Sequence, residues 1–358
     1  MKIIIPLTVD FGPAGGFRVL SQLANYWIDA GHDVSFLTYH QFRKPYYPTK
    51  ANMIFYDGFG RIVSGNVADF APVKSLQLRW AAKSALGKLQ ADVVLATQSF
   101  SAAPVAKSKI GAKKFYYVQA YEPDFYLEGG MKNRLFHRIA EKSYSYALET
   151  IVNAEMYRDY KGITSERVVL PGLDAAVYYP KKQKLTKKDT FIFGTIARKE
   201  KVKGTEYVIE AFRKLRSKYG SQVELHAAFG DDSLAEISGI KILKPDGDEN
   251  LADFYRSIDC YICAGTFQLN AVHYPVIETM ACKTALITTG YYPSNSQNAT
   301  LVSPENSDAI VKAAEMLMNE PERAERKAEI ALQEIAQFYC PHIAEKMLNY
   351  FKENQSEF

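Results

Sequence analysis

The chain has 358 residues, of which 47% are hydrophobic and 23% charged, and its formal net charge is +4. This length exceeds one ordinary hydrophobic core, so two domains are expected. The composition is typical of a soluble globular protein, and it excludes a membrane span because no apolar run reaches about 18 residues. The four cysteines form no metal-binding or disulfide framework and are expected in a reduced core.

Apolar, β-prone runs alternate with helical patterns through the first 180 residues. The N-terminal run is too short for a signal sequence and is predicted to be the first strand. Repeated strand and helix units predict a mostly parallel sheet with helices on both faces. The expected strands are residues 2–7, 34–38, 93–97, 114–118, 150–153 and 167–170, and the expected helices are residues 17–30, 75–89 and 131–148.

A lysine-rich segment at residues 177–189 is the best linker candidate, and the alternation restarts after it. The predicted domains are therefore residues 1–180 and 181–338, followed by a C-terminal helix at 339–358. The expected strands of the second domain are residues 191–197, 223–228, 240–243, 259–263 and 285–288, and its last helices are residues 310–318 and 321–338.

A short basic loop follows the expected strand at residues 191–197. Arg198 comes directly after the strand, and Lys203-Gly204 begins a helix whose apolar stripe is Val208, Ala211, Phe212, Leu215 and Tyr219. Free amides and the positive dipole end of a helix, together with two cations, suit a diphosphate. Solvated loop charges would give the same pattern.

Two loops of the first domain are also candidates for ligand contact. Gly15-Gly16 begins a helix and would let a phosphate approach the backbone, although the spacing does not fit the dinucleotide fingerprint. Residues 118–126 form a polar and aromatic loop in which Gln119 and Glu122 suit hydrogen bonds to a sugar. Aromatic packing within that loop is an equal alternative.

A fourth loop, residues 264–282, contains Asn270, Tyr274 and Glu278. Pro275 is expected to open a helix with Glu278 in its first turn. A carboxylate there could accept hydrogen bonds from the vicinal hydroxyls of a ribose, and it would also interact favourably with the helix dipole.

Together these motifs resemble the retaining nucleotide-sugar glycosyltransferases of family 4. Their order is Gly15-Gly16, Pro171-Gly-Leu-Asp174, Arg198-x4-Lys203-Gly204 and Pro275-x2-Glu278-x-Met-Ala-Cys282. The resemblance covers nearly the whole chain and implies the α/β GT-B fold. That fold has two Rossmann-like domains, a central cleft, and a C-terminal helix that crosses back to the N-terminal domain. Residues 117–126 and 274–278 further resemble a branch that includes rhamnosyltransferases of surface polysaccharides.

The resemblance also implies roles for individual residues. Arg198 and Lys203 would bind the donor diphosphate, and Glu278 would contact the ribose. Asn270 stands where the family usually has the first of two glutamates separated by seven residues. Asparagine can still hydrogen-bond a sugar hydroxyl, but it carries no charge. Backbone contacts to the donor are expected at Gly15, Gly16 and Gly204, and further substrate contacts at Gln119, Glu122 and Tyr274.

The implied reaction moves a hexosyl or deoxyhexosyl group from a nucleotide-diphosphate sugar to a glycan, lipid-linked or other hydroxyl acceptor, with retention of configuration. No cofactor and no divalent metal are expected, because fixed cations would stabilise the leaving diphosphate. Asp246-Gly-Asp248 mimics a metal-binding D-x-D motif but is expected to lie in a polar turn.

Two other functions fit the same pattern. Asn270 leaves open a non-catalytic, glycosyltransferase-like subunit that binds a partner enzyme or a glycan, and a nucleotide-sugar epimerase would share the fold. Nucleic-acid binding is not expected. The expected location is cytoplasmic, with peripheral membrane contact through the helix around Lys132, Arg134, Phe136 and Arg138 if that helix is not merely a solvated face.

Overall fold

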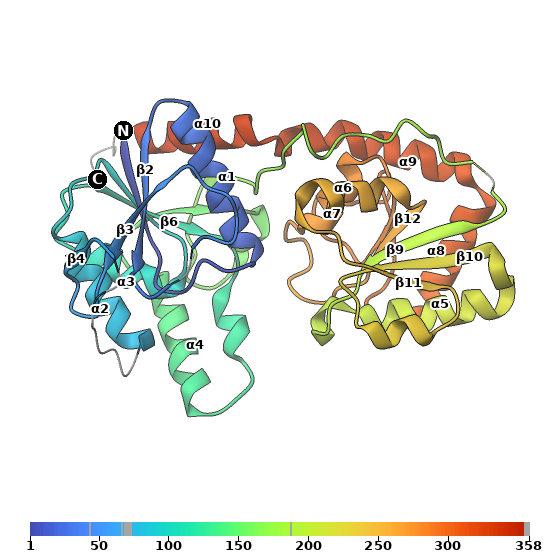
Figure 1. Ribbon diagram of the computed structural model, residues 1–358, viewed down its shortest axis with the longest axis horizontal. Helices are drawn as coiled ribbons and strands as arrows, with labels where there is room; N and C mark the ends of the chain where they lie inside the picture. Colours follow the sequence, from blue (N-terminus) through green and yellow to red (C-terminus); the bar gives the residue numbers. More distant parts are fainter. Residues whose placement is uncertain (43, 66, 68–73, 187, 354–358) are drawn as a thin grey trace. The chain divides into compact units, whose positions relative to one another are not determined.

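The chain folds into two compact units in the computed structural model, which describes residues 1–42, 44–65, 67, 74–186 and 188–353 (Figure 1). The first unit is Met1–Gly172 with Cys340–Phe358, and the second is Leu173–Tyr339. The lysine-rich segment that the sequence suggested as a linker lies in the second unit. Its Lys187, like residues 354–358 of the expected C-terminal helix, lies outside the described residues.

The first unit is built on an eight-stranded sheet in the order β4-β3-β2-β1-β5-β6-β7-β8. Only the β3–β4 pair is antiparallel among the pairings of the described residues, so the predicted mostly parallel sheet is confirmed. The strands are β1 Lys2–Pro6, β2 Asp33–Tyr39, β3 Asn52–Tyr56, β4 Ile62–Val63, β5 Val93–Ala96, β6 Lys113–Val118, β7 Glu149–Val152 and β8 Arg167–Val168.

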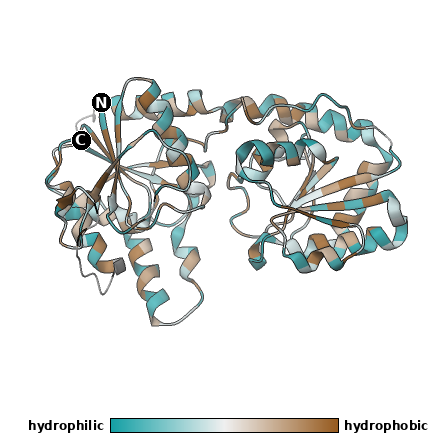
Figure 2. Ribbon diagram, viewed as in Figure 1, coloured by the Kyte–Doolittle hydropathy of each residue, from teal (hydrophilic) through white to brown (hydrophobic). Residues whose placement is uncertain are grey.

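The first helix of this unit buries an apolar face. In α1 the predicted stripe of Leu20, Leu23 and Trp27 is buried, and Figure 2 shows polar and apolar segments alternating along the helices. The helices are α1 Gly15–Asp29, α2 Lys74–Leu86, α3 Ser99–Lys107, α4 Met131–Ser143 and α10 Cys340–Lys352, with short 3-10 turns η1 Glu122–Tyr126 and η2 Glu155–Asp159.

The C-terminal helix α10 packs into the first unit. The indole Nε1 of Trp27 donates to the carbonyl of Ala344 at 3.0 Å, and the ring of Phe351 contacts the rings of Trp27 and Phe115.

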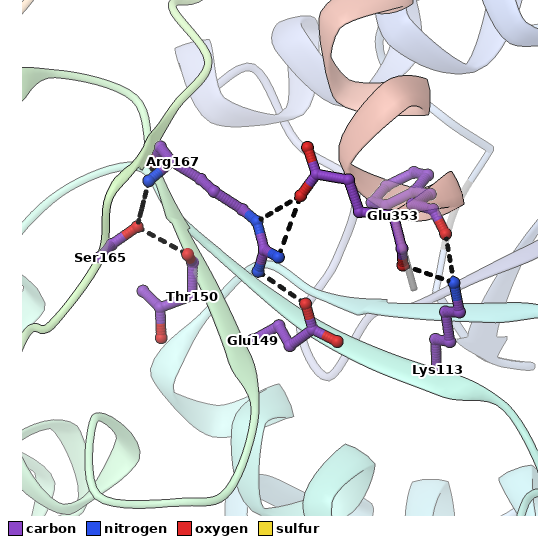
Figure 3. A network of polar contacts seen from close by, with 7 residues as sticks. Lys113, Glu149, Thr150, Ser165, Arg167 and Glu353 are labelled. Atoms are coloured by element: carbon purple, nitrogen blue, oxygen red, sulfur yellow. Dashed lines mark hydrogen bonds and ion pairs between the residues drawn. The ribbon is translucent and has the colours of Figure 1, made fainter. Parts of the chain in front are cut away.

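A polar network fixes the end of the same helix, as Figure 3 shows. The guanidinium of Arg167 joins Glu353 to Glu149 of β7, and Lys113 of β6 donates to the carbonyls of Phe351 and Glu353. The end of the last helix is therefore attached to the first sheet at two strands, at β6 through Lys113 and at β8 through Arg167.

The second unit is a parallel six-stranded sheet in the order β11-β10-β9-β12-β13-β14. Its strands are β9 Phe191–Ile196, β10 Val223–Ala228, β11 Ile240–Leu243, β12 Cys260–Cys263, β13 Ala285–Thr288 and β14 Thr300–Leu301. Its helices are α5 Thr205–Tyr219, α6 Gly247–Ser257, α7 Tyr274–Ala281, α8 Ser307–Asn319 and α9 Pro321–Glu334, and the 3-10 turns are η3 Lys201–Lys203, η4 Gly220–Gln222, η5 Asp232–Glu236 and η6 Ile335–Phe338.

The core of the second unit follows the predicted pattern. Val208, Ala211, Phe212 and Leu215 of α5 are buried beside Phe191 and Phe193 of β9, and Tyr219 packs against them. The described cysteines are all free and buried, as predicted. Among the described residues, no helix combines the length and apolarity needed to cross a bilayer.

Candidate functional site

The order of the strands in the second unit defines a switch point between β9 and β12. From β9 the chain steps to β10 and β11, and it then returns to the other side of β9 with β12. Open parallel sheets bind ligands beyond the carboxyl ends of the strands at such points. The loops that leave β9 and β12 are joined there, because the amide of Thr266 donates to the carbonyl of Val202 at 2.9 Å.

Lys203 lies at this switch point and contacts a histidine that the sequence did not single out. Its Nζ is 3.5 Å from Nε2 of His273, and Nδ1 of His273 is 3.6 Å from Sγ of Cys263. The His273 ring stacks on Tyr291 with centroids 4.6 Å apart. Burial, and secondarily the charge of Lys203, lowers the pKa of His273 to about 3. A neutral imidazole therefore orients the ammonium.

Gly204 lets the two loops approach closely. Its φ is +66°, and a Cβ built on it would lie 1.9 Å from the carbonyl oxygen of Ala264. Only glycine fits this left-handed, crowded position. Gly204 also precedes the first residue of α5, so that the free amides of this helix begin beside Lys203.

Arg198 is exposed at the end of β9. Its guanidinium stands over the ring of Phe229 at 5.8 Å, and its carbonyl accepts a hydrogen bond from the hydroxyl of Thr205 at 2.8 Å. It borders a pocket of about 350 Å³ whose walls include Asp231 and the first half of α5. Arg198 and Lys203 thus belong to one loop but have different partners.

Glu278 lies deeper in α7 than the sequence suggested. Because α7 begins at Tyr274, Glu278 is beyond its first turn, and no acidic residue lies in that turn. The expectation of a first-turn carboxylate was therefore wrong. The residue is 1% exposed, and its Oε2 accepts a hydrogen bond from the hydroxyl of Tyr255 at 2.8 Å. Pro275 does open the helix, as predicted.

Asn270 and Tyr274 lie in the segment between β12 and α7. Asn270 is exposed, has a φ of +70°, and donates its amide to the carbonyl of Gly290 at 3.1 Å. Asparagine tolerates this left-handed conformation better than most residues. Tyr274 is half-buried as the first residue of α7. Both residues therefore lie in the same segment as His273.

The first unit has its own switch point between β1 and β5. The glycine pair begins α1 after β1, as predicted. A Cβ on Gly16 would lie 3.3 Å from both amide atoms of Gln119, which follows β6. Gly16 and Gln119 therefore meet at the carboxyl edge of this sheet, and Gly15 is adjacent.

Several polar atoms at this edge are buried without a hydrogen-bond partner within the described residues. They are Oε1 of Gln119, Oδ1 of Asn153, Oγ1 of Thr97 and Oγ1 of Thr8. They follow four different strands, β6, β7, β5 and β1. Buried polar atoms are nearly always paired in native proteins, so these oxygens are available to hydrogen-bond a ligand or ordered water. No local sequence signal marks Thr8, Thr97 or Asn153.

Glu122 is held by α3 rather than by the loop that contains it. Its carboxylate accepts hydrogen bonds from the backbone amide and the hydroxyl of Ser99, the first residue of α3. Burial raises the pKa of Glu122 to about 6, while these hydrogen bonds act in the opposite direction. Tyr121 of this loop stacks on Tyr144, which directly follows α4, so the loop also packs against its surroundings.

Metal ligands do not gather among the described residues, where no group of three or more His, Cys, Asp or Glu side chains could hold an ion. Asp246 precedes α6 as its N-terminal flanking residue, and Asp248 lies in the first turn of that helix. The D-x-D pattern is therefore a helix start rather than a free turn.

Known proteins share this fold. Residues 187–320 match the model of the family described as glycosyl transferases group 1. No curated protein sequence matches the chain.

Solved structures match over nearly the whole length. Sucrose-phosphate synthase from Thermosynechococcus elongatus is 15% identical, covers 98% of each chain and has a TM-score of 0.77. HepE from Anabaena, solved with UDP and glucose, is 15% identical, covers 99% of this chain and 100% of its own, and has a TM-score of 0.72. TarM from S. aureus, solved with fondaparinux, α-GlcNAc-glycerol and UDP, is 12% identical. It covers 99% of this chain and 100% of its own, and has a TM-score of 0.71.

The two Rossmann-like units, their strand orders and these full-length matches identify the GT-B fold that the sequence predicted.

Proposed function

We propose that the chain is a glycosyltransferase that moves a sugar from a nucleotide-diphosphate sugar to a hydroxyl acceptor. The observation that carries this proposal is the position of Lys203, held by His273 at the β9/β12 switch point beside the start of α5. An ammonium and free helix amides at one point are suited to a diphosphate. The family match at residues 187–320, which includes this loop, supports the same assignment.

The chemistry assigned to this site is stabilisation of a leaving group. When the bond between sugar and phosphate breaks, negative charge grows on the diphosphate and the sugar gains positive character. Lys203, Arg198 and the amides that follow Gly204 would stabilise the diphosphate without reorganising. In this proposal Glu278 and Asn270 contact the donor, and no divalent metal or cofactor takes part.

The first unit would supply the acceptor side and further donor contacts. Gly15 and Gly16 begin a helix beside Gln119, and the unpaired oxygens at that edge would accept hydrogen bonds from hydroxyl groups of a sugar. We propose a glycan or lipid-linked acceptor and a role in surface polysaccharide or glycoconjugate synthesis, inside the cell. Retention of configuration, membership of family 4 and the rhamnosyltransferase branch are part of the same proposal.

Thermal unfolding with a panel of nucleoside diphosphates and their sugars tests the donor. A ligand at 100 times its Kd stabilises the folded state by about 2.7 kcal/mol. UDP and UDP-glucose are the first probes, because HepE has been solved with them. Failure of every nucleotide sugar to raise the melting temperature would contradict the proposal.

Product analysis then separates the remaining alternatives. Transfer with saccharide acceptors would be followed by NMR of the anomeric proton, with and without EDTA. An α-linked product from an α-linked donor at an unchanged rate in EDTA is the expected result. A donor that changes without acceptor would indicate an epimerase, and a donor that binds without turnover would indicate a non-catalytic subunit.

A further inference from the structure

A groove of about 490 Å³ in the first unit lies between α2, α3 and α4. Among the residues that the structure describes, five cationic side chains line it and no carboxylate does. They are Arg79 and Lys83 from α2, Lys107 from α3, and Arg138 and Lys142 from α4. This groove is separate from the carboxyl edge of the sheet, where the residues of the proposed function lie. The cluster of positive charge in the groove therefore needs an explanation other than sugar transfer.

No carboxylate of the described residues neutralises the positive charge of the groove. Within the described part of the chain none of the five cations forms an ion pair with a carboxylate. The nearest acidic residue of α4, Glu141, instead contacts His137 and Lys161. Like charges gathered in one groove repel one another unless an anion lies among them.

Arg79 is the most constrained of these cations. Its guanidinium stands over the ring of Phe100 at 5.4 Å, and its Nε is buried with no hydrogen-bond partner in the described residues. Burial lowers the pKa of this guanidinium, while a hydrogen bond with Tyr146, which also lines the groove, acts in the opposite direction. A desolvated cation is costly when no anion compensates it. The geometry is therefore suited to an anionic group with several oxygen atoms, such as a phosphate.

Large apolar side chains are exposed on two of the helices that form the groove. Trp80 is 57% exposed and Leu76 41% exposed on its α2 wall. On α4, Met131 and Leu135 are 87% and 45% exposed, and their four-residue spacing continues along the same face to Arg138 and Lys142. A small soluble anion would not require such exposed apolar groups, whereas a membrane interface accommodates them.

We propose that this groove docks on an anionic phospholipid bilayer. A head-group phosphate would sit among the five cations, while Trp80, Leu76, Met131 and Leu135 would enter the interface between head groups and acyl chains. Phe136, by contrast, packs against Phe100 and Tyr126, so the contact surface differs from the one that the sequence suggested. The proposal does not depend on sugar transfer, because no residue of the groove belongs to the proposed donor site.

Vesicle co-sedimentation of the full chain tests the docking. Vesicles of phosphatidylcholine with phosphatidylglycerol should sediment the protein, and vesicles of phosphatidylcholine alone should not. Each cation near an anionic surface contributes about fivefold to the partition coefficient, so the double variant Arg138→Gln/Lys142→Gln should bind roughly 25-fold more weakly. Binding should also weaken as salt is raised.

The matched control removes two exposed lysines elsewhere. Lys312→Gln/Lys346→Gln makes the same change in net charge, on α8 and α10, and should leave the partition coefficient unchanged. Equal loss of binding in both double variants would overturn the proposal, because it would indicate a response to net charge alone. Equal binding to neutral vesicles would overturn it as well.

Trp80 offers a second readout that needs no substitution. The chain has two tryptophans, and Trp27 is fully buried, so acrylamide quenches mainly Trp80. Anionic vesicles should protect the fluorescence from quenching and shift the emission to the blue. Protection by inorganic phosphate without any effect of vesicles would show a site for soluble anions and would overturn the membrane assignment.

Discussion

The Nζ atom of Lys203 lies 3.5 Å from Nε2 of His273, at the long end of the hydrogen-bond range. An ammonium only donates hydrogen bonds, so Nε2 must accept and the ring proton must sit on Nδ1, which faces Sγ of Cys263. The contact is therefore possible only while the imidazole is neutral. The burial that lowers the pKa of His273 to about 3 keeps it neutral throughout the physiological range.

This relationship predicts how stability depends on pH. The unfolded chain protonates His273 near pH 6.5, whereas the folded protein protonates it only near pH 3. Between these values the unfolded state binds more protons, so the free energy of unfolding should fall as pH falls, by up to about 1.4 kcal/mol per pH unit. Urea unfolding of the wild type at a series of pH values from 7 to 4 measures the slope.

His273→Gln isolates this contribution, because glutamine keeps a hydrogen-bond acceptor and does not titrate. The difference in unfolding free energy between wild type and variant should shrink or reverse as pH falls from 6.5. Parallel pH profiles of the two proteins would show that His273 is not the group responsible.

A second prediction concerns the orientation of Lys203. His273→Phe keeps a ring that can stack on Tyr291 but removes the acceptor for the ammonium. Hydrogen bonds to charged groups contribute about 1.5–3 kcal/mol, so kcat/KM for sugar transfer should fall by roughly tenfold to a hundredfold. Steady-state kinetics with the donor identified by thermal unfolding measures this change, and His273→Gln should retain more activity. Equal kinetics of His273→Phe and wild type would exclude a positioning role.

The fold could be predicted where one face of an element is buried. The stripe in α5 and the buried strand β9 are visible in the sequence because their apolar spacing matches a helix and a strand. Helix α3 was missed, since it contains Pro104 and is buried on nearly all sides, which leaves no amphipathic period. Strand β3 was missed because only its last residue is buried, and β4 and β14 were missed because each has two residues.

Only the parts of the site that are formed by residues close together in the sequence could be predicted. Lys203-Gly204 is recognisable because a basic, glycine-containing loop joins a strand to a helix. The hydroxyl partner of Glu278 comes from Tyr255, 23 residues away, and the partner of Lys203 comes from His273, 70 residues away. Neither contact has a local signal, because each depends on how segments far apart in the sequence pack together.

A third prediction tests the charge of Lys203 itself. Lys203→Ala should lower kcat by roughly two to three orders of magnitude, the usual loss when one fixed donor to a developing charge is removed. The matched control is Lys201→Ala, since Lys201 belongs to the same 3-10 turn and is exposed. Turnover of Lys203→Ala within tenfold of wild type, or an equal loss in the control, would exclude the assigned role.

A fourth prediction concerns the approach of the two loops. Gly204→Ala should destabilise the protein by roughly 3 kcal/mol, because its left-handed backbone strains an alanine and the new Cβ would collide with the carbonyl of Ala264. Gly31→Ala is the control, since Gly31 also has a positive φ but nothing within 4 Å of a built Cβ. Chemical unfolding should show the larger loss for Gly204→Ala. Equal losses would mean that backbone strain alone is responsible.

A fifth prediction separates ligand binding from stability at the edge of the first sheet. Oε1 of Gln119 is buried and unpaired in the described residues, which costs the folded state about 1–3 kcal/mol. Gln119→Leu has a similar size and removes the unpaired oxygen, so it should raise the free energy of unfolding by up to about 1 kcal/mol. If the oxygen instead serves to bind a sugar hydroxyl, the same variant should lower kcat/KM by at least about tenfold.

Thr300→Val is the control for the combined gain in stability and loss of kcat/KM. Oγ1 of Thr300 is also buried and unpaired within the described residues, but it lies on β14 of the second unit, away from the candidate residues. Its replacement should raise stability without a change in kcat/KM. Ligand sites keep unpaired polar groups although these groups lower stability. We therefore expect only Gln119→Leu to raise the free energy of unfolding and lower kcat/KM together. Loss of stability in Gln119→Leu would show that its amide supports the fold rather than a ligand.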